Sequence, residues 1–329
     1  MKKITVSLIA EKAQVSPATV SRVLKHRELV KEPTIRKVEE AMRSLGCQME
    51  NTVTVSKETQ PLIVLNIPGI ENAFYQEIIR GARVSAKAHG CHLLIHESHL
   101  NKGNMLDFCN LLRRVDAAGV ILLNRISEEA LNQIRTIAPL VQCCEYNEHA
   151  DYPYVSIDDT RAAEIATEYL LSNGGSKIAL INGPGNFKYA KRRQEGFMNA
   201  LQKAEVMIPK QWIVQLPEVS YEMAYAAVCR LLNSDSRPNA FFTISDVFAA
   251  AVIRAAKRFR LHVPRDILVV GFDNIELSSM TSPSITTVNQ PKFQMGYTAC
   301  EMLLELMEDP HEEMKSLLLD TELVIREST

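Results

Sequence analysis

A polar segment near the beginning of the sequence, residues 16–22, contains the side-chain types that contact DNA. Pro17 and Ala18 are small enough to allow a close approach to the bases. Thr19 and Ser21 carry hydroxyls that can bond phosphates, and Arg22 can donate two parallel hydrogen bonds to the edge of a guanine. This combination favours recognition of a DNA groove.

Three short helices are predicted around this segment. The first covers residues 5–13, where Thr5 is a good N-cap and apolar residues recur with helical spacing. Ser16 and Pro17 begin the second helix, and the third runs from about residue 32 to a C-cap at Gly46. In a helix-turn-helix of this kind the second helix enters the major groove. Periodicity alone is equally compatible with a three-helix packing module whose polar face is solvated.

The distribution of charge supports a contact between this end of the chain and a polyanion. The 329 residues have a formal net charge of −2. Residues 1–60 carry 11 Lys or Arg against 7 Asp or Glu, whereas residues 61–329 carry 26 against 32. A basic head of +4 on an acidic body of −6 indicates that the head meets the polyanion.

Composition excludes several classes of protein. With 46% apolar and 23% charged residues the chain is globular, and no run of about 18 apolar residues could span a membrane. Ser7 and the charged residues after it interrupt the apolar start, so we expect no secretory signal. The seven cysteines show no C-x-x-C spacing, which favours reduced thiols in a cytoplasmic protein.

From residue 62 onward, short apolar runs alternate with helical stretches, which predicts parallel sheets covered on both faces. A body of this length would divide into two lobes, with a ligand crevice at the carboxyl ends of the strands. The predicted strands are 62–67, 92–96, 118–123, 140–144, 154–157, 177–181, 240–244 and 267–272, and the predicted helices include 75–89, 102–114, 160–172, 190–204, 220–233, 246–259 and 292–308.

The loops that follow these strands contain side chains suited to a hydroxylated ring. Planar polar groups can bond two adjacent hydroxyls, and an aromatic face can cover the ring. The candidate ligand-binding residues are Phe74, Asn124, Arg125, Glu145, Arg193, Asp246, Phe272 and Asp273. Arg193 and Asp273 are charged groups facing a crevice, and such groups need partners. Each candidate could instead anchor a loop or cap a helix, as Asp246 could for the helix after Ser245.

Two other patterns resemble a metal site and a dinucleotide site, but the spacing of the residues argues against both. The four histidines within residues 89–99 would line one face of a continuous helix, but Gly90 ends the preceding helix and a strand follows. Histidines four apart on a strand lie about 13 Å apart, too far to chelate one metal together. The glycines of residues 183–185 lack the third glycine of a dinucleotide fingerprint. We therefore expect no metal, no cofactor and no enzymatic activity.

The string TVSLIAEKAQVSPATVSRVLKHRELVKEPTIRKVEEAMRSLG resembles the head of the lactose/galactose repressor family (LacI/GalR) of bacterial regulators. The resemblance implies that hydroxyls contact phosphates and that neighbouring side chains face bases. The implied phosphate contacts are Ser16, Thr19 and Ser21, and the implied base contacts are Pro17, Ala18 and Arg22. Thr5 and Val55 complete the predicted DNA-binding residues.

Two departures from the family pattern concern the turn and the linker. The family has Gly where this chain has Gln14, so Gln14 must adopt the left-handed conformation at a modest cost. After Gly46 the family has a Pro-Asn pair and a hinge helix that inserts a Leu into the minor groove. Here the linker is β-branched, lacks Pro-Asn and offers only Val53 or Val55 as a wedge. Whether a hinge helix forms is left open.

Resemblance to the same family continues through the body. The matching blocks are IPGIENAFYQEIIRGA, AGVILLNR, YVSIDDTRAAEIATEYLLSNGGSKIALINGP, RRQEGFMNAL, AFFTISDVFAAAVIRAAKR, VPRDILVVGFDNIELSSMTSPSITTVNQP and ELVIREST. They imply the fold of periplasmic sugar-binding proteins, with two Rossmann-like lobes and three crossovers. The positions that match the family's ligand contacts are Phe74, Arg193, Asp246 and Asp273.

The expected organisation is a small all-α helix-turn-helix head (1–47), a linker or hinge (48–61) and an α/β body (62–329) of two Rossmann-like lobes. The N-lobe would comprise about 62–160 and 291–322, and the C-lobe about 161–290 and 323–329. 

The expected function is a transcriptional regulator, a repressor that binds a pseudo-palindromic operator as a homodimer and responds to a sugar, sugar phosphate or nucleoside. The alternative is a small-molecule-binding protein of the periplasmic type without DNA function. We expect a cytoplasmic protein, associated with the nucleoid when bound to DNA and with no membrane partner. Whether the effector releases the protein from DNA or recruits it stays open.

Overall fold

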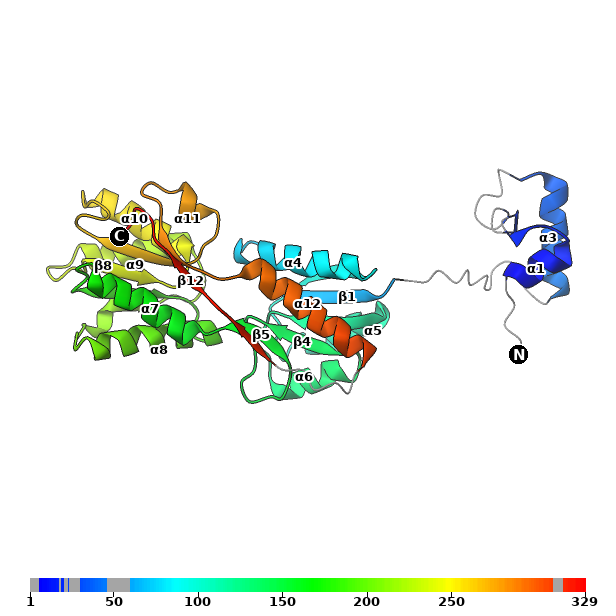
Figure 1. The fold of residues 1–329 in the computed structure, drawn as a ribbon, viewed down its shortest axis with the longest axis horizontal. Coiled ribbons are helices and arrows are strands. Elements are labelled where there is room, and N and C mark those ends of the chain that lie inside the picture. Colours follow the sequence, from blue (N-terminus) through cyan, green and yellow to red (C-terminus); the bar gives the residue numbers. More distant parts are fainter. Residues whose placement is uncertain (1–5, 18, 21–22, 24–29, 46–59, 310–315) are drawn as a thin grey trace. The chain divides into compact units, whose positions relative to one another are not determined.

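The computed structural model describes residues 6–17, 19–20, 23, 30–45, 60–309 and 316–329. The chain divides into two compact units, Met1–Gln60 and Pro61–Thr329, which we call the head and the body. Figure 1 shows the helices of the head and the layered sheets and helices of the body.

The described part of the head is helical. It contains α1 (Val6–Ala13) and α3 (Glu32–Ser44), and residues 17, 19, 20 and 23 between them are helical as well. Apolar side chains from all three segments form one small core, which includes Ile9, Ala10, Ala13, Val20, Val23, Ile35, Val38, Ala41 and Met42. Side chains spaced three or four residues apart on each helix therefore meet in this core, as their periodicity predicts.

The turn between the first two helical segments has the predicted geometry. Gln14 has a φ of 53°, which confirms the left-handed conformation expected where the family has glycine. The Ser16 hydroxyl accepts a hydrogen bond of 3.1 Å from the amide of Thr19. This is the contact of an N-cap residue with the third residue of its helix, so the second helix starts where Ser16 and Pro17 predict.

The body contains two six-stranded sheets, one in each lobe. In the N-lobe the strand order is β11-β5-β4-β3-β1-β2, with all pairings parallel. The strands are β1 (Leu62–Ile67), β2 (His92–Glu97), β3 (Ala117–Leu122), β4 (Leu140–Cys143), β5 (Tyr154–Ile157) and β11 (Leu317–Leu319). The helices are α4 (Phe74–Ala88), α5 (Met105–Arg114), α6 (Glu128–Arg135) and α12 (Lys292–Glu308).

In the C-lobe the strand order is β12-β10-β9-β8-β6-β7, and only the pairing of β12 with β10 is antiparallel. The strands are β6 (Ile178–Asn182), β7 (Ile213–Gln215), β8 (Ala240–Thr243), β9 (Leu268–Asp273), β10 (Thr286–Asn289) and β12 (Glu322–Val324). The helices are α7 (Asp159–Ser172), α8 (Lys188–Lys203), α9 (Tyr221–Leu232), α10 (Asp246–Arg258) and α11 (Leu277–Met280), with a 3₁₀ turn η2 (Lys210–Trp212).

Both faces of the N-lobe sheet are covered, which explains the unbroken apolar runs of its strands. Alternate residues of a strand point to opposite faces. In β1, Ile63 and Leu65 belong to the large core shared with α4 and α12, whereas Val64 belongs to a separate core formed with α5 and α6. The predicted architecture of a helical head and a two-lobed α/β body is therefore confirmed.

The chain passes between the lobes three times, after β5, before α12, and between β11 and β12 (Figure 1). After the second passage α12 packs closely against α4. A Cβ on Gly296 of α12 would lie 2.0 Å from the carbonyl oxygen of Ile78, and a Cβ on Gly81 of α4 would lie 2.0 Å from that of Phe293. The backbones of these two helices are therefore in direct contact, which only glycine allows at both positions.

Candidate functional site

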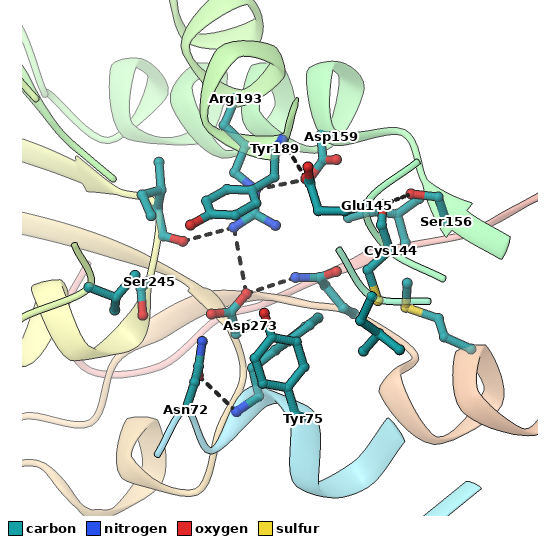
Figure 2. Close-up of a pocket in the computed structure, with 17 residues that line it drawn as sticks. Asn72, Tyr75, Cys144, Glu145, Ser156, Asp159, Tyr189, Arg193, Ser245 and Asp273 are labelled. Atoms are coloured by element: carbon teal, nitrogen blue, oxygen red, sulfur yellow. Dashed lines mark hydrogen bonds and ion pairs between the residues drawn. The ribbon is translucent and has the colours of Figure 1, made fainter. Parts of the chain in front are cut away.

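A cavity lies between the two lobes at the carboxyl ends of the strands. Its volume is about 570 Å³, which includes the part that is open to solvent. Seventeen residues line it, and they come from both lobes. The N-lobe contributes the start of α4 and the segment after β4, whereas the C-lobe contributes α8, the loop after β8 and the end of β9. Figure 2 shows polar side chains directed toward the centre from both sides.

Three contacts fix the position of the Arg193 side chain of α8. Its Nε donates to Asp159 Oδ1 at 2.9 Å, its Nη1 donates to the carbonyl oxygen of Ile244 at 2.8 Å, and its guanidinium lies 3.5 Å from the centroid of the Phe272 ring. The side chain is only 6% exposed. A guanidinium whose orientation is fixed in this way can present its remaining donors to a ligand with little loss of entropy.

Asp159, the first residue of α7, lies between two buried cations. Its Oδ1 accepts from Arg193, and its Oδ2 accepts from Lys188 Nζ at 2.9 Å. Burial raises the pKa of this carboxyl, but Arg193 and Lys188 together lower it below the ordinary value. Asp159 is therefore a carboxylate that neutralises charge within the C-lobe.

Asp273, the last residue of β9, projects its carboxylate into the cavity opposite Arg193 (Figure 2). Its Oδ1 accepts from Gln290 Nε2 at 2.7 Å and lies 3.6 Å from Arg193 Nη1. Burial raises the pKa of Asp273 to about 6, although Arg193 and Lys292 lower it. The pair supplies donors and acceptors at adjacent points, which is the arrangement that binds two neighbouring hydroxyls.

Glu145 follows β4 in the N-lobe but bonds to a helix of the C-lobe. Its two carboxylate oxygens accept from the backbone amides of Lys188 and Tyr189, each at 2.9 Å, and thus satisfy the N-terminus of α8. Burial raises the pKa of Glu145, while Lys188 and the two amide hydrogen bonds oppose this. Nearby, Glu148 pairs with Arg192 of the same helix. These contacts connect the lobes at one edge of the cavity.

Aromatic side chains from both lobes complete the lining. Phe74 and Tyr75 are at the start of α4, and their rings meet edge to face with centroids 5.4 Å apart. Tyr189 of α8 lies beside Arg193, whose guanidinium is 5.0 Å from the centroid of its ring. Burial raises the pKa of Tyr75 and of Tyr189, so both phenols stay protonated and can donate a hydrogen bond.

The structure brings four of the eight predicted ligand-binding residues together in this cavity: Phe74, Glu145, Arg193 and Asp273. Phe272 is fully buried beneath the guanidinium of Arg193 and supports it rather than facing the cavity. Arg125 is half-buried and does not line the cavity. 

Asn124 and Asp246 are buried away from the lining. Asn124 donates to Asn66 Oδ1 at 2.6 Å and to the carbonyl oxygen of Ser98 at 3.0 Å. Asp246 lies behind Asp273, where it accepts from the Thr287 hydroxyl at 2.6 Å and from the amide of Ile275 at 2.8 Å. Burial, reinforced by Asp273, raises the pKa of Asp246 to about 8. The N-cap of α10 is Ser245, whose hydroxyl accepts from the amide of Val247.

Sequence reasoning missed several lining residues, among them Asn72, Tyr75, Asp159, Tyr189, Ser245 and Gln290. Two of these had a usable signal. Asp159 follows a predicted strand, as the chosen candidates do, and Tyr189 precedes Arg193 by four residues and lies directly before the predicted helix 190–204. Gln290 had none, because it lies in a passage between the lobes whose position depends on the whole fold.

In the head, three of the predicted DNA-binding residues are described. Ser16 and Pro17 are exposed, and Thr19 is half-buried with its hydroxyl 2.8 Å from that of Ser16. The other predicted DNA-binding residues, Thr5, Ala18, Ser21, Arg22 and Val55, lie outside the described residues, as does most of the linker.

His96, one of the four histidines within residues 89–99, contacts Asn66 and Phe108. His96 lies with its Nδ1 3.1 Å from Asn66 Nδ2 and its ring 4.8 Å from that of Phe108. Within the described residues, no group of three or more His, Cys, Asp or Glu could hold a metal ion. Of the helices in the same ranges, none has the length and apolarity needed to cross a membrane.

Comparison with known proteins places these features in a family. Residues 5–48 match the family described as bacterial regulatory proteins, lacI family, and residues 167–329 match the periplasmic binding protein-like domain. The chain is 34% identical to the HTH-type transcriptional repressor CytR of Escherichia coli (strain K12), over 99% of this chain and 96% of that protein. It is 31% identical to catabolite control protein A of Priestia megaterium, over 99% of each chain.

A solved structure shares the body. The LacI family transcriptional regulator from Enterococcus faecium with bound ribose is 25% identical, has a TM-score of 0.73, and is matched over 82% of this chain and 98% of that chain. Two relatives are thus more than 30% identical to this chain over nearly their whole length, so the similarity covers both the head and the body. The chain belongs to the lacI family of bacterial regulatory proteins, and it is a transcriptional regulator with a DNA-binding head and an effector-binding body.

Proposed function

We propose that this protein is a repressor that binds a pseudo-palindromic operator as a homodimer, and that a sugar, sugar phosphate or nucleoside in the cavity changes its affinity for that operator. The observation that carries the effector part is the Arg193–Asp273 pair inside a cavity lined by both lobes. The names of the relatives support repression, since CytR is called a repressor, and the ribose in the Enterococcus faecium regulator supports a sugar-like effector.

The lining explains how such an effector could act on the head. A ligand that bonds Arg193 and Asp273 in the C-lobe and touches Phe74 and Tyr75 in the N-lobe contacts both lobes at once. It therefore favours the arrangement of lobes in which both sets of contacts form. A difference in effector affinity between two arrangements is the requirement for a coupled difference in DNA affinity.

Exposed apolar side chains support the homodimer. Ile70, Val84, Ile95 and Met280 are 56%, 45%, 41% and 68% exposed. They belong to the segment before α4, to α4, to the edge strand β2 and to α11, and α4 and α11 lie along the same side of the body in Figure 1. Exposed apolar side chains of this kind are available for a protein–protein interface, and a two-fold dimer would present two heads to two half-sites.

The proposal includes the finer assignments made from the sequence. The head would comprise residues 1–47 and the linker 48–61, with the DNA contacts predicted above and with Val55 as the minor-groove wedge if a hinge helix forms. The protein would be cytoplasmic and would associate with the nucleoid when bound to DNA.

The DNA-binding part is tested by replacing Arg22. An operator fragment is first selected from random DNA with the wild-type protein, and the affinity of Arg22→Ala for this fragment is then measured by gel shift. We expect about 10–100-fold weaker binding, because one bidentate base contact contributes roughly 1–3 kcal/mol. Arg43→Ala, which removes the same charge from an exposed position of α3, is the control and is expected to bind nearly as wild type. Undiminished binding by Arg22→Ala would refute the assignment of the reading helix.

The effector part is tested by ligand-induced thermal shift with pentoses, hexoses, their phosphates and nucleosides. We expect at least one compound to stabilise the wild type, and Arg193→Ala to bind that compound roughly 10–100-fold more weakly, because a hydrogen bond to a charged group contributes about 1.5–3 kcal/mol. Lys191→Ala, on the exposed side of α8, should retain wild-type binding. A shift that is unchanged in Arg193→Ala would remove this residue from the site, and no shift with any compound would contradict the proposed effector class.

A further inference from the structure

Lys292 is a buried lysine, and the groups that its ammonium hydrogen-bonds among the described residues are backbone carbonyls. It is the first residue of α12 and is 7% exposed. Its Nζ donates to the carbonyl oxygens of Asp273, of Asn274 at 3.2 Å and of Gln290 at 3.5 Å. An ammonium has three donors, so these contacts use all of them, and Lys292 is not among the residues that line the cavity.

The turn that this ammonium contacts has an uncommon backbone conformation. Asp273 has a φ of 100° and Asn274 a φ of 48°, so two consecutive residues with side chains occupy the region that favours glycine. Residues in such conformations persist where the surrounding structure stabilises them, often at ligand sites. Here Lys292 bonds the carbonyl oxygens of both residues, and its charge makes these hydrogen bonds stronger than neutral ones.

The same turn carries the carboxylate of the cavity. Asp273 Oδ1 accepts from Gln290 and faces Arg193, as Figure 2 shows for the Arg193–Asp273 pair. Lys292 thus contacts Asp273 through its backbone, while the ligand-facing groups contact it through its side chain. The main chain of Lys292 begins α12, which packs on α4 and on the N-lobe strands β3 and β4. A single side chain therefore joins an N-lobe helix to a C-lobe turn.

We propose that Lys292 is a positioning residue of the effector site: its ammonium holds the Asp273–Asn274 turn in the left-handed conformation, fixes the Asp273 carboxylate in the cavity, and ties that carboxylate to the start of α12. The proposal rests on the cavity being the effector site, but its test requires no effector. The link provides a route by which occupancy of the cavity biases the position of α12 relative to the C-lobe.

Charged groups from four helices surround the Asp273 carboxyl. Because they shift its pKa in opposite directions, the contribution of Lys292 can be measured as a change in that pKa. Arg193 of α8 and Lys292 of α12 lower the pKa of Asp273, while burial and Asp159 of α7 raise it. Asp246 of α10 is the second carboxyl behind the turn. Glu77 of α4 faces Lys292 from the N-lobe. Loss of the Lys292 ammonium leaves Arg193 as the remaining cation of this set.

The experiment is an NMR titration of the full-length protein labelled with 13C at the aspartate carboxyls. The Asp273 signal is identified by its absence in Asp273→Asn. Lys292→Met is expected to raise the pKa of Asp273 by about one unit, since loss of a nearby opposite charge has effects of this size. It should also accelerate hydrogen exchange of the Asn274 and Ile275 amides. Lys292→Arg, which keeps the charge, should restore both properties, and exposed Lys87→Met should leave them as in the wild type.

A folded Lys292→Met protein whose Asp273 titration and amide exchange match the wild type would overturn the proposal. If Lys292→Met does not fold, Lys292→Gln is read in the same way. A measurement on the wild type needs no neutral variant: the 15Nζ signal of Lys292, identified by its loss in Lys292→Arg, should exchange slowly with water, and rapid exchange would also overturn the proposal. Failure of the effector proposal would appear separately, in the thermal shifts of wild type and Arg193→Ala.

Discussion

The Asp159→Ala variant is expected to lose about 3–5 kcal/mol of stability, because removal of one member of a buried ion network leaves the other charges without compensation. Asp159 is 4% exposed and bonds Lys188 and Arg193, which are 3% and 5% exposed. The alanine variant would remove the carboxylate that pairs with Lys188 and would leave Arg193 with the longer contact of 3.6 Å to Asp273. Trp212, the single tryptophan, is buried in the C-lobe, so urea unfolding followed by its fluorescence reports on this lobe.

The pH dependence of this effect has a definite sign. The folded-state pKa of Asp159 lies below its ordinary value of 3.8, so its stabilising contribution is present above about pH 4 and is lost as the pH falls through the folded-state pKa. The difference in stability between wild type and Asp159→Ala should therefore shrink below about pH 4. Asp158→Ala is the control: this neighbour is exposed and caps α7, and its loss should cost only about 1 kcal/mol. Equal losses for the two variants would contradict a dominant role of the buried network.

The Gly296→Ala variant should destabilise the body by about 3 kcal/mol or more, because the new methyl group would meet backbone rather than a movable side chain. The added Cβ would lie 2.0 Å from the carbonyl oxygen of Ile78, so α12 and α4 would have to move apart and lose the packing of both. Helix propensity alone predicts the opposite sign, a gain of roughly 0.5–1 kcal/mol for Gly to Ala in a helix. The sign of the change in the free energy of unfolding therefore shows which effect is larger, the backbone overlap or the helix propensity.

Urea unfolding followed by circular dichroism measures this change. Gly185→Ala, in the turn before α8, is a control for the added methyl group alone, since its Cβ would lie 3.6 Å from the end of the Gln215 side chain, an ordinary contact. We expect the control to remain near the wild-type stability. A Gly296→Ala protein as stable as the wild type would mean that the two helices can separate without loss, and the close backbone contact would then have no energetic importance.

The sequence predicted the central strands well, because strands buried on both faces are unbroken apolar runs. β1 and β6 are buried along nearly their whole length, and their predicted and observed ranges agree closely. The edge strands β7, β11 and β12 have three residues each, too few to stand out from a loop. β10 escaped prediction for another reason: Thr286 and Thr287 are fully buried, and their hydroxyls bond within the fold instead of marking a surface.

For the candidate site, the sequence could identify residues that follow strands, but it could not show which of them line the cavity and which are buried beneath it. Asp273 lies at the end of β9, as the rule about strand ends anticipates, whereas Arg193 reaches it from helix α8. Asn124 obeys the same rule, yet it bonds Asn66 beneath the surface of the cavity. The sequence predicts that Lys292 begins a helix but indicates no role for it, because only the tertiary structure shows the two left-handed residues that it contacts. The residues next to Lys292 in the sequence do not indicate that it contacts the carbonyl oxygens of Asp273 and Asn274.

The order in which the lobes are synthesised differs from the order in which they can be completed. The N-lobe starts first, but α12 and β11 belong to it and follow the whole C-lobe apart from β12. Its large core includes Met295, Ala299 and Leu303 of α12, so that core stays incomplete while about 150 residues, from the end of β5 to the end of α12, emerge. At about 5–20 residues per second this lasts roughly 10–30 s. During translation the apolar faces of α4 and β1 that pack on α12 therefore wait for this time without their final partner.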